Sequence, residues 1–593
     1  MLKEFLRSKA GALWLGMLAT LLCFIILWCG ATTFRALSDW MLYPVNLLMS
    51  VLLILPYMLF RRVWVQVVTM AALQALLIAN LMYCRTFFSA IPIDSYGLAS
   101  NLADFTSSIT DSLRAADLLF PLITVATALI ARRRPRPASF RRAWTVTGSA
   151  AALFAVITAG GLAAKGGFIK EADRISQSCY YSTTLTPVYT LAGSLLHQAL
   201  TSPTTLTPEL EAEVSGWLAG KEAQAPYQAL PDSVERRKSL VLILCESLES
   251  WVLQTELGGH PVTPVLDSLI ALPSTLYAPN VVTQVGAGRS IDAQLLINAG
   301  LLPMLHSVYS MKYPSRRYPS LNKAMREQYG ARSMLLSVDK PITWNQAGVS
   351  RSFGCDTLLD RSAWQIDEVI GSPAKLSDRS FLRQCAAKLS QADLWPAGAS
   401  RYVTIITYSG HNPFILPDHL KDPAFAPSTA PYPERLADYL NMAHYTDSAL
   451  SEIISYLSSR PDYQDMLVVI TGDHEGLASY RSEFLAHPEG RKIVSPGQFT
   501  PLIILNSPLP GRHDAVMGQI DIYPTLLNLM GLDSYQWKGL GNSIFSPAAP
   551  SFAIVSMTGE TVGDTLATPP VLRSLTRRAR SVSDAMITFD LFP

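Results

Sequence analysis

Acidic and imidazole side chains follow three apolar runs in the C-terminal half of the sequence. Glu246 comes directly after the first run, His411 shortly after the second, and Asp473 with His474 after the third. Carboxylate oxygens and imidazole nitrogens, without a thiolate pair, are ligands that suit Mn²⁺, Mg²⁺ or Zn²⁺. If the three runs are strands of one open sheet, their carboxyl ends lie at one edge, where such sheets build their sites. The pattern therefore predicts a divalent-metal site.

Each of these residues also has a purely structural explanation. Glu246 could be a solvated carboxylate at a strand end, Asp473 could cap a helix, and His411 could close a loop. Taken singly, each residue favours the structural explanation. Taken together, acidic groups and imidazoles that converge after very apolar strands favour the metal site.

The segment Gly286–Ala293 (GAGRSIDA) contains a candidate nucleophile. Its two glycines permit tight turns in which backbone amides can approach an anion closely. Arg289 supplies a fixed positive charge, and Ser290 would begin a helix over Ser290–Ala299, with its hydroxyl at the positive end of the helix dipole. The alternative is that Ser290 is only an N-cap, and the spacing leaves both interpretations open.

The elements that must position these residues form an α/β pattern that begins near Ser239. Short, continuously apolar runs alternate with helical periodicity, which is typical of a mainly parallel sheet covered on both faces. One further apolar run, Ser333–Val338, leads to Asp339 and then to Thr343–Asn345. The predicted strands are Leu240–Cys245, Ser333–Val338, Tyr402–Thr407, Met466–Thr471 and Leu502–Asn506, and the predicted helices include Leu436–Leu457 and Asp521–Met530.

Composition shows that this α/β region cannot be the whole protein. The 593 residues are 49% hydrophobic and 16% charged, and mean hydropathy is +0.22, which is too apolar for a wholly soluble chain. The same values exclude a disordered chain, a collagen and a small disulfide scaffold. A net charge of +2 gives no overall basic field for nucleic acid. We therefore expect membrane and soluble parts.

Apolar runs long enough to span a bilayer are concentrated before residue 165. Eleven Lys and Arg residues flank them on one side, against Arg35, Arg85 and Arg114 on the other. By the positive-inside rule, the N-terminus is cytoplasmic and everything after the fifth span lies outside the cytoplasm. The predicted spans are Gly11–Gly30, Met41–Phe60, Val63–Tyr83, Ala116–Ala131 and Ala143–Ala163.

These patterns predict a transmembrane domain over residues 1–165, juxtamembrane helices and a linker over 166–232, and an extracytoplasmic catalytic domain over 233–593. Pro187–Leu200 is apolar but short, which favours an amphipathic helix on the outer membrane surface. The seven cysteines are scattered and indicate no disulfide framework, although a bridge between Cys355 and Cys385 stays open.

In chain order, a set of local motifs resembles the lipoteichoic acid synthase and phosphoglycerol transferase branch of the alkaline phosphatase/sulfatase superfamily. The resemblance covers nearly the whole chain. The motifs are specific to this branch and less specific to substrate. They are LVLILCESLES (240–250), VGAGRSIDAQ (285–294), YPSL (318–321), TWNQAG (343–348), FGCDTLLD (353–360), YSGHNPF (408–414), YLNMAHYTDSAL (439–450), VVITGDHEG (468–476) and GQIDIYPTLLNLMGL (518–532).

The resemblance implies roles for individual residues. Glu246, Asp473 and His474 would bind one divalent metal, Mn²⁺ by the family pattern, with Mg²⁺ or Zn²⁺ as alternatives. Ser290 falls on the nucleophile, a threonine in the synthases, and would also contact the metal. Trp344 and His411 fall where the family contacts the glycerol phosphate head group.

Two positions depart from the family pattern. The synthases carry arginine two residues after the tryptophan, where this chain has Gln346, and a histidine seven residues before it, where this chain has Ser337. We still assign Gln346 to the substrate-binding set, but the exact head group and acceptor stay open. The motif that sulfatases convert to formylglycine is missing at Ser290, which disfavours true sulfatase activity.

The resulting hypothesis is an enzyme of the bacterial cytoplasmic (inner) membrane that moves glycerol phosphate from phosphatidylglycerol. Ser290 would form a covalent phospho-serine intermediate, Arg289 would stabilise developing negative charge, and His411 would position the head group or transfer a proton. The acceptor would be an envelope glycan or polymer. Alternatives are phosphoethanolamine transfer, head-group hydrolysis, and a catalytically silent relative that binds the cell envelope.

Overall fold

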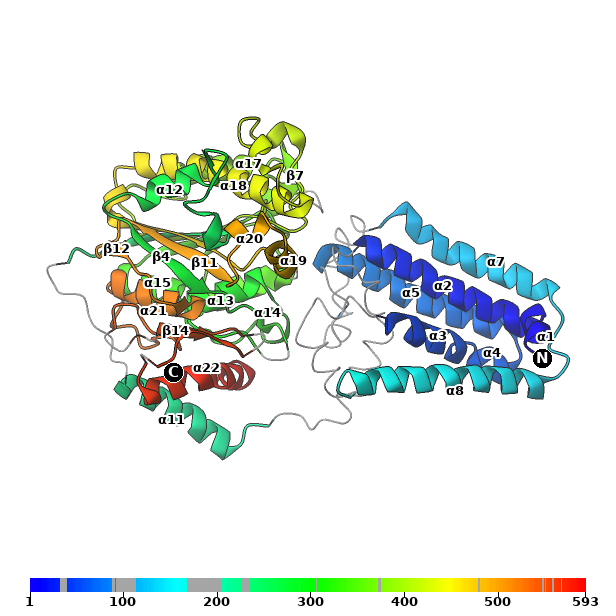
Figure 1. Ribbon diagram of the computed structural model, residues 1–593. Coiled ribbons are helices and arrows are strands. Elements are labelled where there is room, and N and C mark those ends of the chain that lie inside the picture. Colours follow the sequence, from blue (N-terminus) through cyan, green and yellow to red (C-terminus); the bar gives the residue numbers. More distant parts are fainter. Residues whose placement is uncertain are drawn as a thin grey trace. The chain divides into compact units, whose positions relative to one another are not determined.

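The computed structural model divides into two compact units, Met1–Thr204 and Thr205–Pro593 (Figure 1). It describes residues 1–31, 40–87, 91, 113–167, 205–224 and 234–593, apart from 287, 305–306, 372–374, 478–479, 547–548, 550, 557–558 and 567. The amphipathic helix predicted over Pro187–Leu200 lies outside these residues. In its described part the first unit is helical, and the second is a sheet between helices.

The first unit contains, among its described residues, five segments long and apolar enough to cross a membrane. These are Lys9–Trp28, Leu42–Phe60, Val63–Met82, Ala115–Arg133 and Phe140–Ala164, which confirm the five predicted spans. The helices that form the unit are α1 (Leu2–Arg7), α2 (Lys9–Ala31), α3 (Leu42–Leu52), α4 (Leu55–Phe60), α5 (Val63–Phe87), η3 (Ala115–Leu118), α7 (Leu119–Arg133) and α8 (Phe140–Ala164).

Three polar side chains inside this unit are paired with one another across helices. Gln74 of α5 donates from Nε2 to Thr20 Oγ1 of α2 at 3.2 Å and accepts from Thr124 Oγ1 of α7 at 2.9 Å. All three residues are buried. Because hydrocarbon offers no competing hydrogen bonds, such groups are satisfied within the protein.

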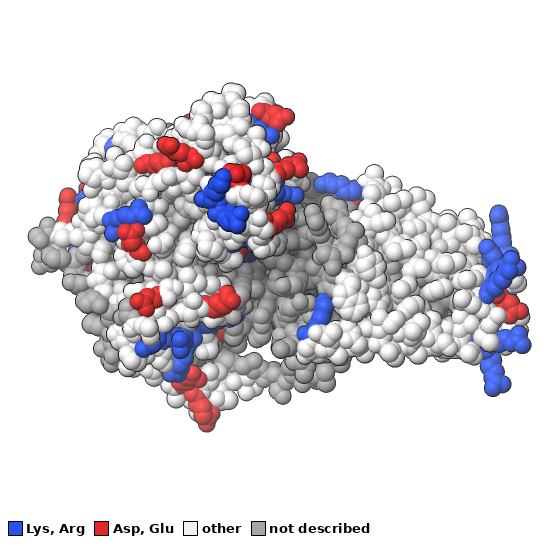
Figure 2. Space-filling model, in the orientation of Figure 1, with Lys and Arg blue, Asp and Glu red and all other residues white. Residues whose placement is uncertain are grey.

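Basic residues gather at one end of this unit, where the chain begins (Figure 2). The connections that carry them touch one another there: Lys9 N donates to Pro135 O at 2.9 Å, and the Arg61 guanidinium lies 4.6 Å from the Phe140 ring centroid. The N-terminus, the α4–α5 connection and the α7–α8 connection therefore share one side, as the charge count predicts.

The second unit is built on a mainly parallel sheet with the order β12-β4-β11-β10-β1-β9-β5-β6, in which β13 pairs with β4. β10, β1, β9, β5 and β6 are parallel, whereas β11 is antiparallel to β10 and β4. All five predicted strands are confirmed. The strands are β1 (Ser239–Cys245), β4 (Leu276–Val282), β5 (Arg332–Ser337), β6 (Thr357–Leu359), β9 (Arg401–Ile406), β10 (Met466–Gly472), β11 (Phe499–Leu505), β12 (Gly511–Arg512) and β13 (Met517–Gly518).

Strand β4 was not predicted from the sequence. Pro279 and Asn280 interrupt its apolar run, and both residue types are unfavourable in strands. The strand forms because its flanking residues, including Leu276 and Val281, are buried against the sheet's core. Tertiary packing here overrides local propensity.

Each face of the sheet is covered by helices, as the continuous apolar runs predict. Along β1, Leu240, Leu242 and Leu244 enter one core, and Val241, Ile243 and Cys245 the other. Figure 1 shows the two helical layers. One contains α12 (Pro264–Ile270), α17 (Asp378–Leu389) and α18 (Glu434–Ser459). The other contains α13 (Ser290–Ala299), α15 (Leu321–Tyr329), α21 (Ile522–Leu529), α22 (Pro570–Phe589) and, by its core contacts, α16 (Gln346–Phe353).

The segment interpreted as a linker contains helix α11 (Pro208–Gln224), which belongs to the second unit. Buried Trp217 donates from Nε1 to Leu575 O of α22 at 3.0 Å, and buried Lys221 donates to Gly539 O at 2.8 Å and to Gly541 O. The polar composition of α11 gave no sign of this packing, because one Trp and one Lys make most of these contacts.

Candidate active site

The register of the sheet brings Glu246, Asp473 and His474 together. Strands β1 and β10 are parallel neighbours with Cys245 opposite Gly472, so Glu246 and Asp473 leave the sheet side by side. One ligand atom from each of the three residues lies within 4.8 Å of the others, and all three residues are buried. Burial excludes the solvated strand-end explanation for Glu246.

Asp473 has one satisfied and one open carboxylate oxygen. Its Oδ1 accepts from the backbone amides of Ser247 and His474, both at 2.8 Å. Its Oδ2 is buried, lies 3.5 Å from His474 Nε2 and accepts no hydrogen bond from the residues that the structure describes. A buried acceptor without a donor is costly, and an open carboxylate oxygen between a second carboxylate and an imidazole fits a divalent cation.

The protonation of Glu246 and His474 also favours a cation. Burial and the charge of Asp473 raise the pKa of Glu246 well above its usual value, so a bound cation would take the place of a proton. Burial, with the charge of Arg289, lowers the pKa of His474 to about 3. Its Nδ1 lies 2.9 Å from Glu475 O and 3.0 Å from Arg289 Nη2, and the tautomer that donates from Nδ1 to the carbonyl leaves Nε2 as a lone-pair ligand.

Ser290 reaches this group from the first position of α13. The N-cap of the helix is Arg289, so the explanation of Ser290 as the N-cap is wrong. Ser290 Oγ donates to Glu246 Oε2 at 3.4 Å and lies 3.5 Å from His474 Nε2. The hydroxyl predicted as nucleophile is therefore within contact distance of two candidate metal ligands.

The glycine-rich loop before Ser290 is folded around Asp292. The amides of Gly286 and Gly288 both donate to Asp292 Oδ2 at 2.9 Å. A Cβ at position 288 would lie 2.5 Å from Asp292 Oδ1, so this close approach requires glycine. The sequence predicted that these amides could approach an anion, and the anion they contact is a side chain of the same loop.

Arg289 is paired with Glu475, a residue to which the sequence assigned no role. Arg289 Nη1 donates to Glu475 Oε1 at 2.6 Å, and Nη2 donates to Glu475 O at 3.0 Å. Burial raises the pKa of Glu475, but the charge of Arg289 opposes this and leaves the pKa below its usual value. The pair fixes the backbone carbonyl that orients His474.

Glu249 is a second supporting carboxylate that the sequence did not identify. It is fully buried and accepts from the amides of Gly476 and Leu477 at 2.8 and 2.9 Å and from Arg481 Nη2 at 2.5 Å. Its position three residues after Glu246 is the signal that could have found it. Through these bonds Glu249 holds the loop that carries Asp473 and His474.

His411 follows β9, the parallel neighbour of the strand that ends before Glu246. Burial and the charge of Lys375 lower the pKa of His411 to about 4, so the ring is neutral at pH 7. Its Nδ1 lies 2.7 Å from Asn412 O, and the ring stacks on Tyr408 with centroids 5.3 Å apart. With Nδ1–H donating to the carbonyl, Nε2 is an acceptor.

Trp344 and Gln346 follow β5 but differ in setting. Trp344 is only partly buried and has φ 52°, and Asn345 beside it has φ 53°, so two consecutive residues are left-handed. Strain of this kind concentrates at functional sites. Gln346 instead exchanges two hydrogen bonds with Gln294 of α13, at 3.0 and 2.9 Å, and is buried. The structure thus directs the Gln346 amide to α13 and does not bring it to the ligand group.

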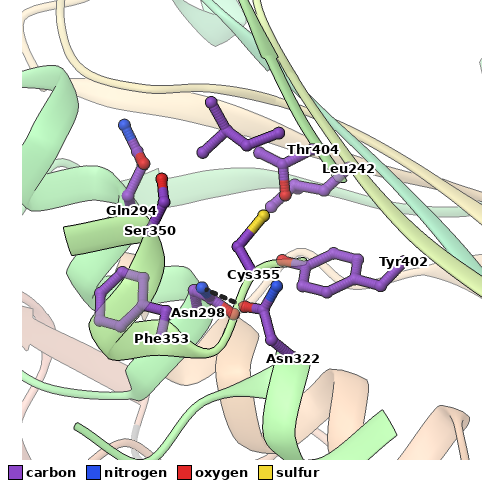
Figure 3. A pocket seen from close by; sticks show the side chains of 10 residues that line it. Leu242, Gln294, Asn298, Asn322, Ser350, Phe353, Cys355, Tyr402 and Thr404 are labelled. Atoms are coloured by element: carbon purple, nitrogen blue, oxygen red, sulfur yellow. Dashed lines mark hydrogen bonds between the residues drawn. The ribbon is translucent and has the colours of Figure 1, made fainter. Parts of the chain in front are cut away.

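A small cavity lies between the sheet and the helices α13, α15 and α16 (Figure 3). Asn298 donates to Asn322 at 2.8 Å across it. Cys355 lines it as a free thiol, and Cys385 is also free, so the bridge between them does not form. The lining residues are Leu242, Gln294, Asn298, Asn322, Leu335, Ser350, Phe353, Cys355, Tyr402 and Thr404.

Two family models match this chain. The model of the lipoteichoic acid synthase N-terminal domain matches residues 2–175, and the sulfatase model matches residues 238–532. The first covers the five spans. The second covers Glu246, Ser290, His411, Asp473 and His474.

Individual relatives agree with these models. The chain is 27% identical to the lipoteichoic acid synthase of Staphylococcus saprophyticus over 322 residues, which are 52% of this chain and 48% of the relative. It is 26% identical to that of Staphylococcus aureus over 321 residues, 53% and 48%. The match thus spans about half the length of these curated relatives. A crystal structure of the lipoteichoic acid synthase LtaP from Listeria monocytogenes shares the fold, with a TM-score of 0.54 and 19% identity over 65% of this chain and 99% of that one.

Proposed function

Because this chain belongs to the lipoteichoic acid synthase-like branch of the alkaline phosphatase/sulfatase superfamily, we propose that it transfers glycerol phosphate from phosphatidylglycerol to an envelope glycan or polymer. The observation that carries the proposal is the Ser290 hydroxyl, 3.4 Å from Glu246 and 3.5 Å from His474 beside the open oxygen of Asp473. The transfer takes place on the extracytoplasmic side of the membrane, in keeping with the basic residues at the opposite end of the spans.

Glu246, Asp473, His474 and Ser290 would hold one divalent ion, which we expect to be Mn²⁺. When bound, such an ion lowers the pKa of a neighbouring hydroxyl and stabilises charge on phosphoryl oxygens. Ser290 Oγ loses its proton and forms a bond to phosphorus while the bond from phosphorus to the diacylglycerol oxygen breaks. Diacylglycerol takes up a proton and leaves, and Ser290 carries the phosphoglycerol group.

The second step returns Ser290 to its starting state. An acceptor hydroxyl attacks phosphorus, the Oγ–phosphorus bond breaks, and Ser290 recovers a proton. His411, neutral and with Nε2 as an acceptor, suits either a hydrogen bond from a head-group hydroxyl or the proton of the attacking acceptor. The partly exposed Trp344 would contact the glycerol.

Arg289 and Glu249 act as positioning residues in this proposal. The Arg289 guanidinium is bonded to Glu475, and Glu475 O orients the imidazole of His474. Arg289 still leaves a positive charge behind the ligand group, which favours the anionic phosphate. Glu249 keeps the loop after β10 in place through its bonds to the amides of Gly476 and Leu477.

Mass spectrometry of the Ser290 peptide tests the proposal most directly, because the added mass identifies the transferred group. The full-length protein would be incubated with Mn²⁺ and phosphatidylglycerol vesicles without acceptor and quenched in acid. We expect phosphoglycerol on Ser290, and an unmodified peptide after incubation with phosphatidylcholine vesicles. Release of glycerol phosphate with Ser290 unmodified throughout would overturn the covalent route, and no release at all would overturn the transferase.

A further inference from the structure

The candidate active site contains a charge pair that the family motifs do not include. Lys375, on the short strand β8 (Lys375–Leu376), donates to Asp339 Oδ1, and its Nζ lies 4.0 Å from the centroid of the Tyr408 ring. Tyr408 stacks in turn on His411. Lys375 therefore contacts the face of Tyr408, the ring that stacks on His411.

The charge of Lys375 is also felt at His411 and at Glu246. The Lys375 charge acts on both His411 and Glu246, lowering the pKa that burial has already lowered in the first and opposing the rise that burial causes in the second. The side chains of Lys375 and Asp339 are 15% and 29% exposed, so both are partly open to solvent. A ligand at His411 thus meets a cation and a carboxylate together.

The other polar groups near this position are already engaged. Gln346, where the synthases have arginine, is neutral and bonded to Gln294. Arg289 is bound to Glu475 at 2.6 Å. Lys375 is therefore a cation near His411 that, unlike Arg289, has no part in holding His474.

We propose that Lys375, held by Asp339, selects the head group: the pair accepts the neutral polyol of glycerol phosphate and disfavours a head group that carries an ammonium, a proposal that rests on the proposed function. An ammonium would be placed beside the Lys375 ammonium, and the Asp339 Oδ1 that could attract it is already bonded to Lys375. Glycerol hydroxyls instead can donate to Asp339 and lie against Lys375 without repulsion. Discrimination here comes from a repulsive element as well as an attractive one.

Competition between two lipids in one vesicle tests this proposal. Phosphatidylglycerol and phosphatidylethanolamine would carry different acyl chains, so that mass spectrometry separates the two diacylglycerol products. Full-length protein with Mn²⁺ should release mainly the product from phosphatidylglycerol. We expect Lys375→Met to lower the ratio of the two products by about tenfold, because Asp339 then attracts the ammonium.

Three further variants separate charge from structure. Lys375→Arg should keep the wild-type ratio. Asp339→Asn, which leaves the cation in place, should keep or raise the product ratio. The double variant with Lys375→Met and Asp339→Asn should lose the increased use of phosphatidylethanolamine that Lys375→Met alone shows. Lys492→Met, which removes an exposed lysine paired with Glu489, is the matched control and should leave both products unchanged.

The outcomes distinguish this proposal from the one on which it rests. If the product ratio is unchanged in Lys375→Met while the wild type still uses phosphatidylglycerol, the proposed role of Lys375 is overturned and the proposed function is not. A fall in the ratio in Asp339→Asn equal to that in Lys375→Met also overturns it, because the pair would then be merely structural. A wild-type protein that releases diacylglycerol from neither lipid overturns the proposed function as well.

Discussion

Gln74 in the membrane unit and Asp473 in the second unit are both polar and buried, but they differ in what their oxygens contact. Both polar atoms of the Gln74 amide are bonded to threonines of neighbouring helices. Asp473 has one oxygen bonded to two amides, and the other accepts no hydrogen bond in the described part of the chain. A buried polar side chain whose hydrogen bonds are all made within the protein supports packing. One that keeps an atom without a partner at a rigid sheet edge is suited to bind a ligand.

The strongest test of this contrast is Ser290→Ala. It removes one hydroxyl from the open group without affecting the buried core, so folding should be retained while head-group release from phosphatidylglycerol falls at least about a thousandfold. The assay is diacylglycerol formation in vesicles. Ser268→Ala, which removes an exposed hydroxyl on α12, should behave as the wild type; full turnover by Ser290→Ala would end the nucleophile assignment.

Asp473→Asn tests whether Asp473 Oδ2 binds a divalent cation. An amide in this place is neutral and can offer N–H instead of a lone pair, so Mn²⁺ affinity measured by calorimetry should fall by about a hundredfold or more. Without Mn²⁺ the variant should be at least as stable as the wild type, because a buried charge is removed. Asp514→Asn, at an exposed carboxylate, is the control. Equal affinity in the wild type and Asp473→Asn would contradict the metal site.

The effect of pH should differ between the metal-free and metal-loaded protein. Because the pKa of Glu246 is raised in the folded state, metal-free protein loses stability as pH rises from the unfolded-state value toward the folded one. Mn²⁺ displaces that proton, so its affinity should increase with pH, by about tenfold per unit where one proton is released. His474, with a pKa lowered to about 3, should release no proton on Mn²⁺ binding above pH 5, and its own effect on metal-free stability is a rise with pH up to its ordinary pKa. Calorimetry in buffers of different ionisation enthalpy measures the proton released, and pH-independent affinity would contradict this account.

Gln74→Leu should have the smallest effect, because it removes only the two hydrogen bonds to Thr20 and Thr124 in the membrane unit. An interhelical hydrogen bond in a membrane protein contributes about 0.6 kcal/mol on average, and leucine recovers part of this by packing. We expect a slightly lower unfolding temperature in detergent and unchanged diacylglycerol formation. A large loss of turnover would show that the membrane unit takes a direct part in the chemistry.

Much of this architecture could be predicted because its signals are local. Continuous apolar runs identified the five spans and the five main strands, and strand ends identified Glu246, His411, Asp473 and His474. The resemblance added Trp344, Gln346 and the expectation of Mn²⁺. The α13 helix was predicted at its observed bounds, since Ser290–Ala299 is apolar and ends at Gly300.

The remainder depends on pairings that only the folded chain makes. Glu475 looks like any polar residue until Arg289, 186 positions away, lies against it. Lys375 has no motif around it, and its importance comes from Asp339 and Tyr408. Gln346 was assigned to the substrate from its place in a motif, but a single partner, Gln294, redirects its amide. Long-range partners of this kind leave no periodic signal in a sequence.

Helix α11 has a mechanical consequence. It carries the chain into the second unit and is fastened by Trp217 to α22, the helix near the end of the same chain. This bond joins the first and last described helices of the second unit, although 358 positions separate the two bonded residues in the sequence. Fraying at either end of the unit is therefore opposed by the other end.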